Sequence, residues 1–527
     1  MNRLIGVLVG VVVLVLSGTA SVSIAASGPH GELRGVVLIV IDTLRADHLG
    51  TYGSMRGLSS RIDRMAGDGL IFARATAASS WTRSSLATVH LGVSPEVHGV
   101  HDREHSLPPT MPTLAGTLSA AGVETVGLHA NVNTGASFGF SRGFDHYAHA
   151  TATRKYPEDS DPLVSAETMT REVLEEIDER EMGSQRPFFF SVHYVDPHDP
   201  YFDHPELGRG AQPAGRFNGS RKALQRMDSL PAAKRTPLDE ERIRFLYEGE
   251  VQWVDRHVGG LLDGLAERGL LKDCLVILTS DHGEGLWEHG ERAHGRDLYE
   301  EQIHVPLIVT TPVGWEIAPQ HITGRVAHED IPATIASAFG VSLPPAWTGR
   351  DLVKMVRDGS PGRSEVRSSL SLDWLDIAAL IEGDRKAIRN RSFDPERRDR
   401  THVVREGDTL MGLSWKYFGS SDAIGRFTAL NQSLLGGRGT HGPLPRGQRL
   451  KVPDVEGDSG LLLEVYDLAS DPRETRNRAT DNPKFAARMH KELAAGAKPK
   501  AEPAPSKPIG AMDPDVLDRL RGLGYLE

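Results

Sequence analysis

The sequence predicts an α/β fold in which a central mixed sheet lies between layers of helices. Continuous apolar runs that suit buried strands occur at residues 36–41, 187–195, 275–279 and 305–310. Helical patterns lie between these runs, for example at residues 166–180 and 240–268. Because strands and helices alternate and each run ends at polar residues, ligands are expected at the carboxyl ends of the strands.

The composition is that of a soluble globular chain, and it excludes several classes of function. Of the 527 residues, 39% are hydrophobic and 25% are charged, which is ordinary for a folded protein of several domains. The 60 Lys and Arg residues are outnumbered by 71 Asp and Glu, so the net charge is −11 and nucleic acid is not expected as a partner. A single cysteine excludes an internal disulfide and any all-thiolate metal cluster.

Residues 1–26 are predicted to be a secretory signal peptide. Arg3 precedes an uncharged apolar run at residues 4–16, and Ala26 ends a stretch of small residues that suits cleavage. The alternative is an uncleaved N-terminal anchor, although the apolar run is shorter than the roughly 20 residues that span a bilayer. Both interpretations predict an exported protein of the periplasm or the cell envelope.

Four patches carry residues suited to catalysis or metal binding, at residues 42–47, 79–86 with 92–100, 193–201 and 279–295. Asp42 follows the first predicted strand, and Asp281 and His282 follow a later one, so two carboxylates and an imidazole are offered to one divalent cation. Hydroxyl side chains open the helix of the second patch, where the helix dipole stabilises an alkoxide or a bound oxyanion. The first two patches alone also suit ordinary helix caps and the Asp-His pair of the fourth suits a capped turn, but together with the His and Asp residues of the third patch they predict a metal-assisted site.

In this order, the patches resemble the motifs of the sulfatase family, within the alkaline-phosphatase-like superfamily of metal-dependent hydrolases. The segments that carry the resemblance are residues 39–47, 92–99, 196–198, 280–284, 298–307 and 466–474. The resemblance implies a catalytic domain at residues 34–358 with an alkaline-phosphatase-like sandwich. It also implies a small α+β C-terminal subdomain, here split into residues 359–400 and 456–492, before a linker and terminal helix at residues 493–527.

The sequence departs from the family at the nucleophile. The family carries a Cys-x-Pro-Ser-Arg motif, or a Ser version of it, whose first residue is oxidised to formylglycine. An alignment on Ser79 keeps the Arg of the motif at Arg83. An alignment on the spacing to Gly92 instead places Thr82 at the nucleophile and Leu86 at the Arg position. We favour Thr82 because its alignment needs no gap, and since threonine cannot become formylglycine, that cofactor is not expected.

The resemblance also implies roles for the remaining site residues. The implied ligands of one divalent metal ion, whether Ca²⁺, Mg²⁺, Mn²⁺ or Zn²⁺, are Asp42, Thr82, Asp281 and His282. The metal is expected to lower the pKa of the Thr82 hydroxyl, whose alkoxide then attacks the ester. His198 and His294 match positions that grip the transferred group or protonate the leaving oxygen. Water must then attack the sulfur or phosphorus of the Thr82 ester, because that ester cannot be resolved by elimination.

Other residues keep open roles at this stage. Asn131 lies where the family often places a polar residue that contacts the substrate. A second metal ion bound by His193, Asp196 or His289 is an alternative to a single-metal site. Cys274 directly precedes a buried strand and is interpreted as an inert small hydrophobic residue.

Residues 401–454 interrupt the C-terminal subdomain, and residues 402–453 resemble a LysM domain, a small βααβ unit. The opening strand and helix start match at residues 402–410, and apolar residues recur at helical spacing at residues 423–430. The closing loop and strand match at Asn431 and residues 445–453. Such modules bind peptidoglycan or other polymers of N-acetylglucosamine, so the resemblance implies a cell-wall glycan as partner.

The sequence therefore predicts an exported, metal-dependent hydrolase that cleaves sulfate or phosphate esters, with Thr82 as nucleophile. Its expected substrate is a sulfated or phosphorylated glycan or a small ester. Two alternatives stay open: a non-catalytic glycan-binding protein on a sulfatase scaffold, and a transferase that moves a phospho-alcohol group onto envelope glycans. The retained Asp42, Asp281 and His282 argue against the non-catalytic protein, because a binding scaffold does not need them.

Overall fold

The computed structural model gives the fold of most of the chain. It describes residues 26–28, 31–159, 162–183, 186–230, 234–372, 375–390, 401–404, 409–410, 413, 424–435, 444, 448–451, 463–479, 481, 483–495 and 504–505. The predicted signal peptide, apart from Ala26, and the predicted terminal helix lie outside the described residues. Among the helices that the structure describes, none is both long and apolar enough to span a membrane.

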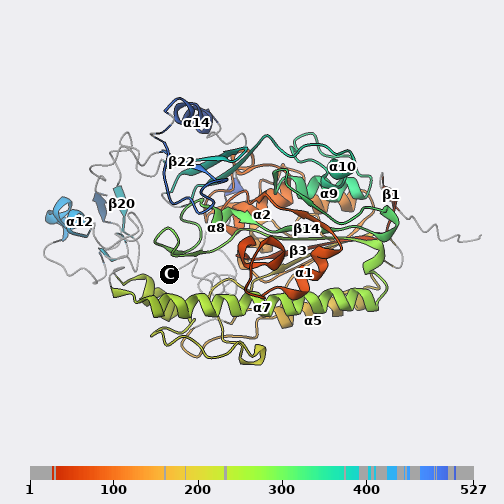
Figure 1. Ribbon diagram of the computed structural model, residues 1–527, viewed down its shortest axis with the longest axis horizontal. Coiled ribbons are helices and arrows are strands. Elements are labelled where there is room, and N and C mark those ends of the chain that lie inside the picture. Colours follow the sequence, from red (N-terminus) through yellow and green to blue (C-terminus); the bar gives the residue numbers. More distant parts are fainter. Residues whose placement is uncertain are drawn as a thin grey trace, which may run out of the picture.

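An eight-stranded mixed sheet forms the centre of the molecule, which confirms the predicted α/β class (Figure 1). Its strands, in spatial order, are β15 (Gln320–Ile322), β4 (Leu70–Phe72), β14 (Leu307–Thr310), β10 (Cys274–Ser280), β3 (Gly35–Ile41), β9 (Phe188–Tyr194), β7 (Glu124–His129) and β8 (His146–His149). The five strands from β10 to β8 are parallel, whereas β14 runs antiparallel to both of its neighbours. The central strands β3, β9 and β10 are buried along their whole length, as their continuous apolar sequences require.

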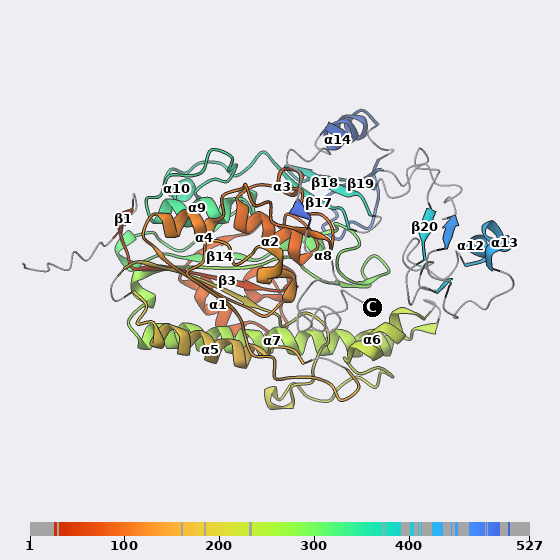
Figure 2. The same ribbon diagram turned by 180° about the vertical axis from the view of Figure 1, so that it is seen from behind.

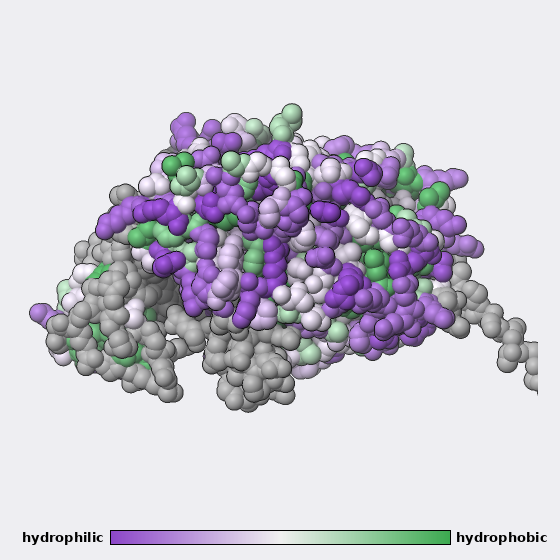
Figure 3. Space-filling view, turned by 90° about the horizontal axis from the view of Figure 1, so that it is seen from below, coloured by the Kyte–Doolittle hydropathy of each residue, from purple (hydrophilic) through white to green (hydrophobic). Residues whose placement is uncertain are grey.

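Helices cover both faces of this sheet. The helices are α2 (Thr82–Leu91), α4 (Leu114–Ala120) and α9 (Asp330–Ala338) on one face, and α1 (Ser60–Gly67), α5 (Ala166–Glu179) and α7 (Pro237–Glu267) on the other (Figures 1 and 2). The long helix α7 begins earlier than its pattern indicated because Thr236 and Asp239 form a capping box around Pro237. The molecular face that α5 and α7 cover is largely hydrophilic (Figure 3).

A second sheet follows the first in the chain and carries a buried ion cluster on one of its faces. Its strands, in spatial order, are β17 (Glu365–Leu370), β18 (Ile377–Glu382), β19 (Arg385–Asn390) and β22 (Leu463–Asp467), all antiparallel. Helix α14 (Pro483–Ala495) covers one face of this sheet. From the other face, Lys386 Nζ reaches Glu300 Oε1 at 2.9 Å and Glu474 Oε1 at 2.8 Å. Lys386 therefore links helix α8 (Glu300–Ile303) to this sheet.

Between the paired strands β19 and β22 the chain makes a small unit with a core of its own (Figure 2). Its described elements are β20 (Thr401–Val403), α12 (Ile424–Leu430), α13 (Gln432–Leu435) and β21 (Arg449–Lys451), and β20 pairs antiparallel with β21. Among the residues described here, the core of this unit includes Val404, Leu410, Leu413, Phe427, Leu435, Leu444 and Leu450. Leu430, which matched the helical apolar pattern, is exposed instead.

Asn431 fastens the helical part of this small unit to its closing strand. The Asn431 side-chain amide donates to the Lys451 carbonyl at 2.7 Å, and its side-chain oxygen accepts from the Lys451 amide at 2.7 Å. Asn431 is itself buried, so these bonds lie where water does not compete for them.

Candidate active site

Parallel pairing brings the predicted metal ligands together at one edge of the sheet. In the register of β3 and β10, Ile41 pairs with Ser280, so the next residues, Asp42 and Asp281, leave the sheet side by side. One ligand atom from each of Asp42, Asp281 and His282 lies within 4.8 Å of those of the other two, and all three residues are completely buried. Two carboxylates and one imidazole thus converge on one point.

The donor set fits a divalent cation. Asp42 Oδ1 and Asp281 Oδ2 are buried and have no hydrogen-bond partner among the described residues. Burial and the charge of Asp281 raise the pKa of Asp42. Burial also opposes ionisation of Asp281, but the imidazoles of His282 and His193 outweigh it and hold the Asp281 pKa below its ordinary value. Since an unpartnered buried carboxylate is costly, a bound cation would satisfy both oxygens.

Thr82 lies at this point, at the first position of helix α2. Its Oγ1 is 3.2 Å from His282 Nε2. His282 Nδ1 lies 2.9 Å from the Gly283 carbonyl, which accepts its proton, so Nε2 carries the lone pair and Thr82 donates to it. The N-cap Trp81 makes no side-chain cap, which leaves the first backbone amides of the helix free of a capping side chain beside Thr82.

The other residues considered for the nucleophile motif are Ser79, Arg83 and Leu86, and each has different surroundings. Leu86 packs in the hydrophobic core under α2. The hydroxyl of Ser79 is buried without a hydrogen-bond partner among the described residues, so it forms no hydrogen bond to the described Asp42, Asp281 or His282. Arg83 donates to Asn133 Oδ1 at 2.8 Å and lies over the Phe138 ring.

His198 and His294 lie on one side of the site and contact each other. Their ring centroids are 4.9 Å apart, and the His294 ring lies 4.4 Å from that of His282. Burial lowers the pKa of His198 to about 4, and burial also lowers the pKa of His294. Burial therefore favours the neutral form of both imidazoles.

Two side chains that sequence reasoning left without a firm role contact Asp42. Asn131 Nδ2 donates to Asp42 Oδ2 at 2.7 Å, so this amide holds the carboxylate that faces the cation position. His193 Nε2 lies 3.6 Å from the same oxygen, and burial lowers the His193 pKa to about 4. His193 pairs with Val40 across β3 and β9, a long-range register that the sequence pattern does not specify.

The other two residues considered for a second metal are engaged elsewhere. Asp196 accepts from the Ala166 amide at 2.5 Å. His289 Nδ1 pairs with Glu301 Oε1 at 2.6 Å, and its ring stacks on Tyr299. The only group of three or more metal-ligating side chains among the described residues is that of Asp42, Asp281 and His282. The geometry therefore favours a single-metal site.

A hydrogen-bonded chain behind His294 was not identified from the sequence. Glu284 is completely buried and lies between His294 Nδ1, at 3.2 Å from Oε1, and the Tyr201 hydroxyl, at 3.0 Å from Oε2. Burial raises the pKa of Glu284 to about 7, against the opposing effect of Arg292. The sequence signal was present in part, since Glu284 belongs to the fourth patch, but its partners are distant in the chain.

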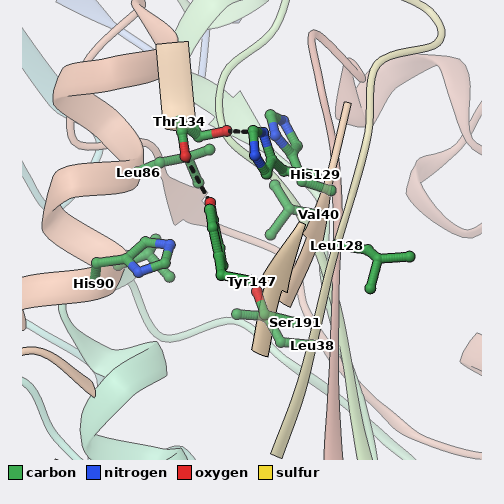
Figure 4. A pocket seen from close by; sticks show the side chains of 11 residues that line it. Leu38, Val40, Leu86, His90, Leu128, His129, Thr134, Tyr147 and Ser191 are labelled. Atoms are coloured by element: carbon green, nitrogen blue, oxygen red, sulfur yellow. Dashed lines mark hydrogen bonds between the residues drawn. The ribbon is translucent and has the colours of Figure 1, made fainter. Parts of the chain in front are cut away.

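A small cavity lies beside the site, between α2 and the sheet (Figure 4). Apolar side chains such as Leu38, Leu86 and Leu128 line it together with His90, His129 and His193. Tyr147 crosses the cavity wall and donates to the Thr134 carbonyl at 2.6 Å (Figure 4). Because the space is only about that of one water molecule, the cavity does not accommodate a substrate.

Comparisons with known proteins agree with this arrangement. A family model described as sulfatase matches residues 34–341, which is more than half of the chain. The chain belongs to the sulfatase family. Enzymes of this family use a divalent metal, and the Asp42, Asp281 and His282 cluster lies inside the matched region.

Named relatives of this sulfatase-family chain include ester hydrolases. Human iduronate 2-sulfatase is 28% identical over 53% of this chain and 60% of its own length, so the match spans less than two thirds of that relative. The fold is similar to that of a 2-O GAG sulfatase, at a TM-score of 0.61 and 18% identity over 88% of this chain and 91% of the other. It is also similar to a phosphonate monoester hydrolase of Agrobacterium radiobacter, at a TM-score of 0.60 and 18% identity over 88% and 95%.

Proposed function

We propose that this sulfatase-family protein is an exported, metal-dependent hydrolase of sulfate or phosphate esters that uses Thr82 as its nucleophile. The observation that carries the proposal is the position of Thr82 Oγ1, 3.2 Å from His282 Nε2 and at the start of helix α2. Relatives named for sulfate and phosphonate ester hydrolysis support both ester classes. A sulfated glycan is the proposed natural substrate, in line with the 2-O GAG sulfatase among the structural neighbours.

Asp42, Asp281 and His282 would hold the metal ion, with Thr82 adjacent to them. When bound, a divalent cation supplies charge stabilisation for the ester oxygens and for the Thr82 alkoxide. Thr82 Oγ1 loses its proton and forms a bond to sulfur or phosphorus, while the bond to the leaving oxygen breaks and that oxygen takes up a proton to leave as the alcohol. The backbone amides at the start of α2, which have no capping side chain, would stabilise the negative charge of the non-bridging oxygens.

The decisive experiment is turnover of nitrophenyl sulfate, nitrophenyl phosphate and a bis-nitrophenyl phosphodiester by the full chain. Thr82→Ala is expected to reduce turnover by about 1,000-fold or more, because it removes the nucleophile, whereas Ser79→Ala is expected to retain it. Mass spectrometry of peptides from the quenched reaction should find the sulfate or phosphate on Thr82. Loss of activity only in Ser79→Ala, or an adduct on Ser79, would contradict the assignment.

The small unit at residues 401–454 is proposed to be a LysM module that holds the enzyme at cell-wall glycan. A separate apolar core and the antiparallel pair β20 and β21 support an independently packed βααβ unit inserted between β19 and β22. Such a module would raise the local enzyme concentration near the polymer.

Co-sedimentation with peptidoglycan or chitin tests this part. The full chain is expected to pellet with the polymer, and a chain lacking residues 401–454 is expected to stay in the supernatant while it still turns over the nitrophenyl ester. Equal sedimentation of the two chains would refute the targeting role and leave the hydrolase proposal untouched.

A further inference from the structure

The buried Glu284 connects the site to a chain of side chains that has no assigned role. Glu284 Oε1 lies 3.2 Å from His294 Nδ1, and Glu284 Oε2 lies 3.0 Å from the Tyr201 hydroxyl. Arg292 reaches the same hydroxyl at 3.3 Å, and it also pairs with Asp199 at 3.1 Å and Asp228 at 2.7 Å. Tyr201 and Glu284 are fully buried, so the chain is shielded from water.

The direction of these hydrogen bonds follows from their first member. A guanidinium can only donate, so Arg292 donates to the Tyr201 oxygen. The Tyr201 proton is then available for Glu284 Oε2, and in the ionised state of Glu284 the other carboxylate oxygen accepts from His294 Nδ1–H. In that state the His294 proton is on Nδ1, and the lone pair is on Nε2.

The His294 ring lies next to the candidate metal ligand that contacts Thr82. Its ring lies 4.4 Å from the ring of His282, whose Nε2 is 3.2 Å from Thr82 Oγ1. The His294 side chain is 9% exposed, whereas that of Glu284 is completely buried, so of this pair only the imidazole retains contact with solvent.

A threonine nucleophile requires a hydrolysis step that a formylglycine hydrate does not require. Its ester must be cleaved by water, and water is a poor nucleophile unless a base removes a proton. We propose that His294, oriented by Glu284 and Tyr201, is the general base for hydrolysis of the Thr82 ester, with Glu284 as its positioning residue. The inference rests on the proposed Thr82 nucleophile.

The step balances in atoms and protons. The water oxygen forms a bond to the sulfur or phosphorus of the Thr82 ester as His294 Nε2 takes one of its protons. The bond from that atom to Thr82 Oγ breaks, and the Thr82 oxygen recovers a proton from the imidazolium. Free sulfate or phosphate leaves, and both side chains return to their starting states.

Glu284→Gln tests the positioning role with the nitrophenyl ester that the wild type turns over. The side-chain amide that this substitution introduces can donate to His294 Nδ1, which moves the proton to Nε2 and removes the base. Stopped-flow measurement should show a first turnover at a rate near that of the wild type, followed by a steady state slowed on the order of 100-fold. Intact-mass spectrometry should show one sulfate or phosphate held on Thr82. Tyr201→Phe should slow the steady state less, by about tenfold, and also accumulate the adduct.

Glu250→Gln is the matched control. Glu250 Oε2 lies 3.0 Å from His204 Nε2, with both side chains completely buried, so the substitution disturbs a similar pair outside the site. It is expected to accumulate no adduct, even where its melting temperature falls as much as that of Glu284→Gln.

Three results would overturn the inference. Equal slowing of the first turnover and the steady state in Glu284→Gln would indicate a merely structural role. Absence of an adduct in both Glu284→Gln and Tyr201→Phe would also refute the base. A wild type that turns over no ester would refute the proposed function itself, and this inference with it.

Discussion

Two clusters of buried carboxylates in this molecule differ in whether a side chain of the protein supplies the neutralising cation. At the ends of β3 and β10, Asp42 and Asp281 each present a buried oxygen with no hydrogen-bond partner among the described residues, and the neutral His282 imidazole beside them supplies no cation. At the junction with the second sheet, Lys386 reaches both Glu300 and Glu474 from a fully buried position. The Lys386 cluster contains its own cation and links two parts of the structure. The cluster of Asp42 and Asp281 contains no cation of its own and is therefore suited to bind a metal ion.

The largest expected effect is at the cluster without its own cation. Asp281→Asn removes one carboxylate from the candidate metal site, so we expect loss of bound divalent metal by elemental analysis. Turnover of the nitrophenyl ester should fall by about 1,000-fold, because the charge stabilisation from a metal is worth several kcal/mol. Retention of stoichiometric metal and activity would show that the carboxylate has a different role.

Lys386→Met should break the other cluster without affecting the first. It leaves Glu300 and Glu474 without their cation, and removing one partner of a buried ion pair costs about 3–5 kcal/mol of unfolding free energy. Urea unfolding should report this loss, while metal content stays at the wild-type level. Lys354→Met, which removes an exposed pair with Asp358, is the control and should leave the unfolding midpoint unchanged. A fall in metal content with Lys386→Met would mean that the two clusters are coupled.

A smaller, pH-dependent effect is expected at the edge of the junction. Burial opposes protonation of His289, but its hydrogen bond and ion pair with Glu301 prevail and raise its pKa to about 9. Because this folded-state pKa lies above the unfolded value of about 6.5, the stabilisation is fully present below pH ~6.5 and is lost as the pH rises through about 9. The difference in melting temperature between wild type and His289→Gln should shrink over that range.

The exposed His321→Gln variant is the control for the pH experiment, and its melting temperature should follow the wild type at every pH. A constant difference between wild type and His289→Gln from pH 6 to 10 would contradict the predicted ion pair.

The four patches identified in the sequence lie at strand ends and at one helix start because these signals are local. The apolar run before Asp42 forms a buried strand, and the run before Asp281 forms its parallel neighbour, so the order of apolar and polar residues already places both carboxylates at one sheet edge. The hydroxyl run at residues 79–85 likewise marks a helix start, although the structure begins α2 at Thr82.

The partners of these residues were decided by tertiary structure. Asn131 meets Asp42 across 89 residues of sequence, and Tyr201 meets Glu284 across 83. No periodicity relates such positions, because strand order and loop packing bring them together. The sequence by itself thus determined the α/β class, the strand-end carboxylates and the absence of a cysteine in the nucleophile motif. Only the tertiary structure decided which buried charges are paired, since a charge is satisfied by whatever the fold places within a few ångströms of it.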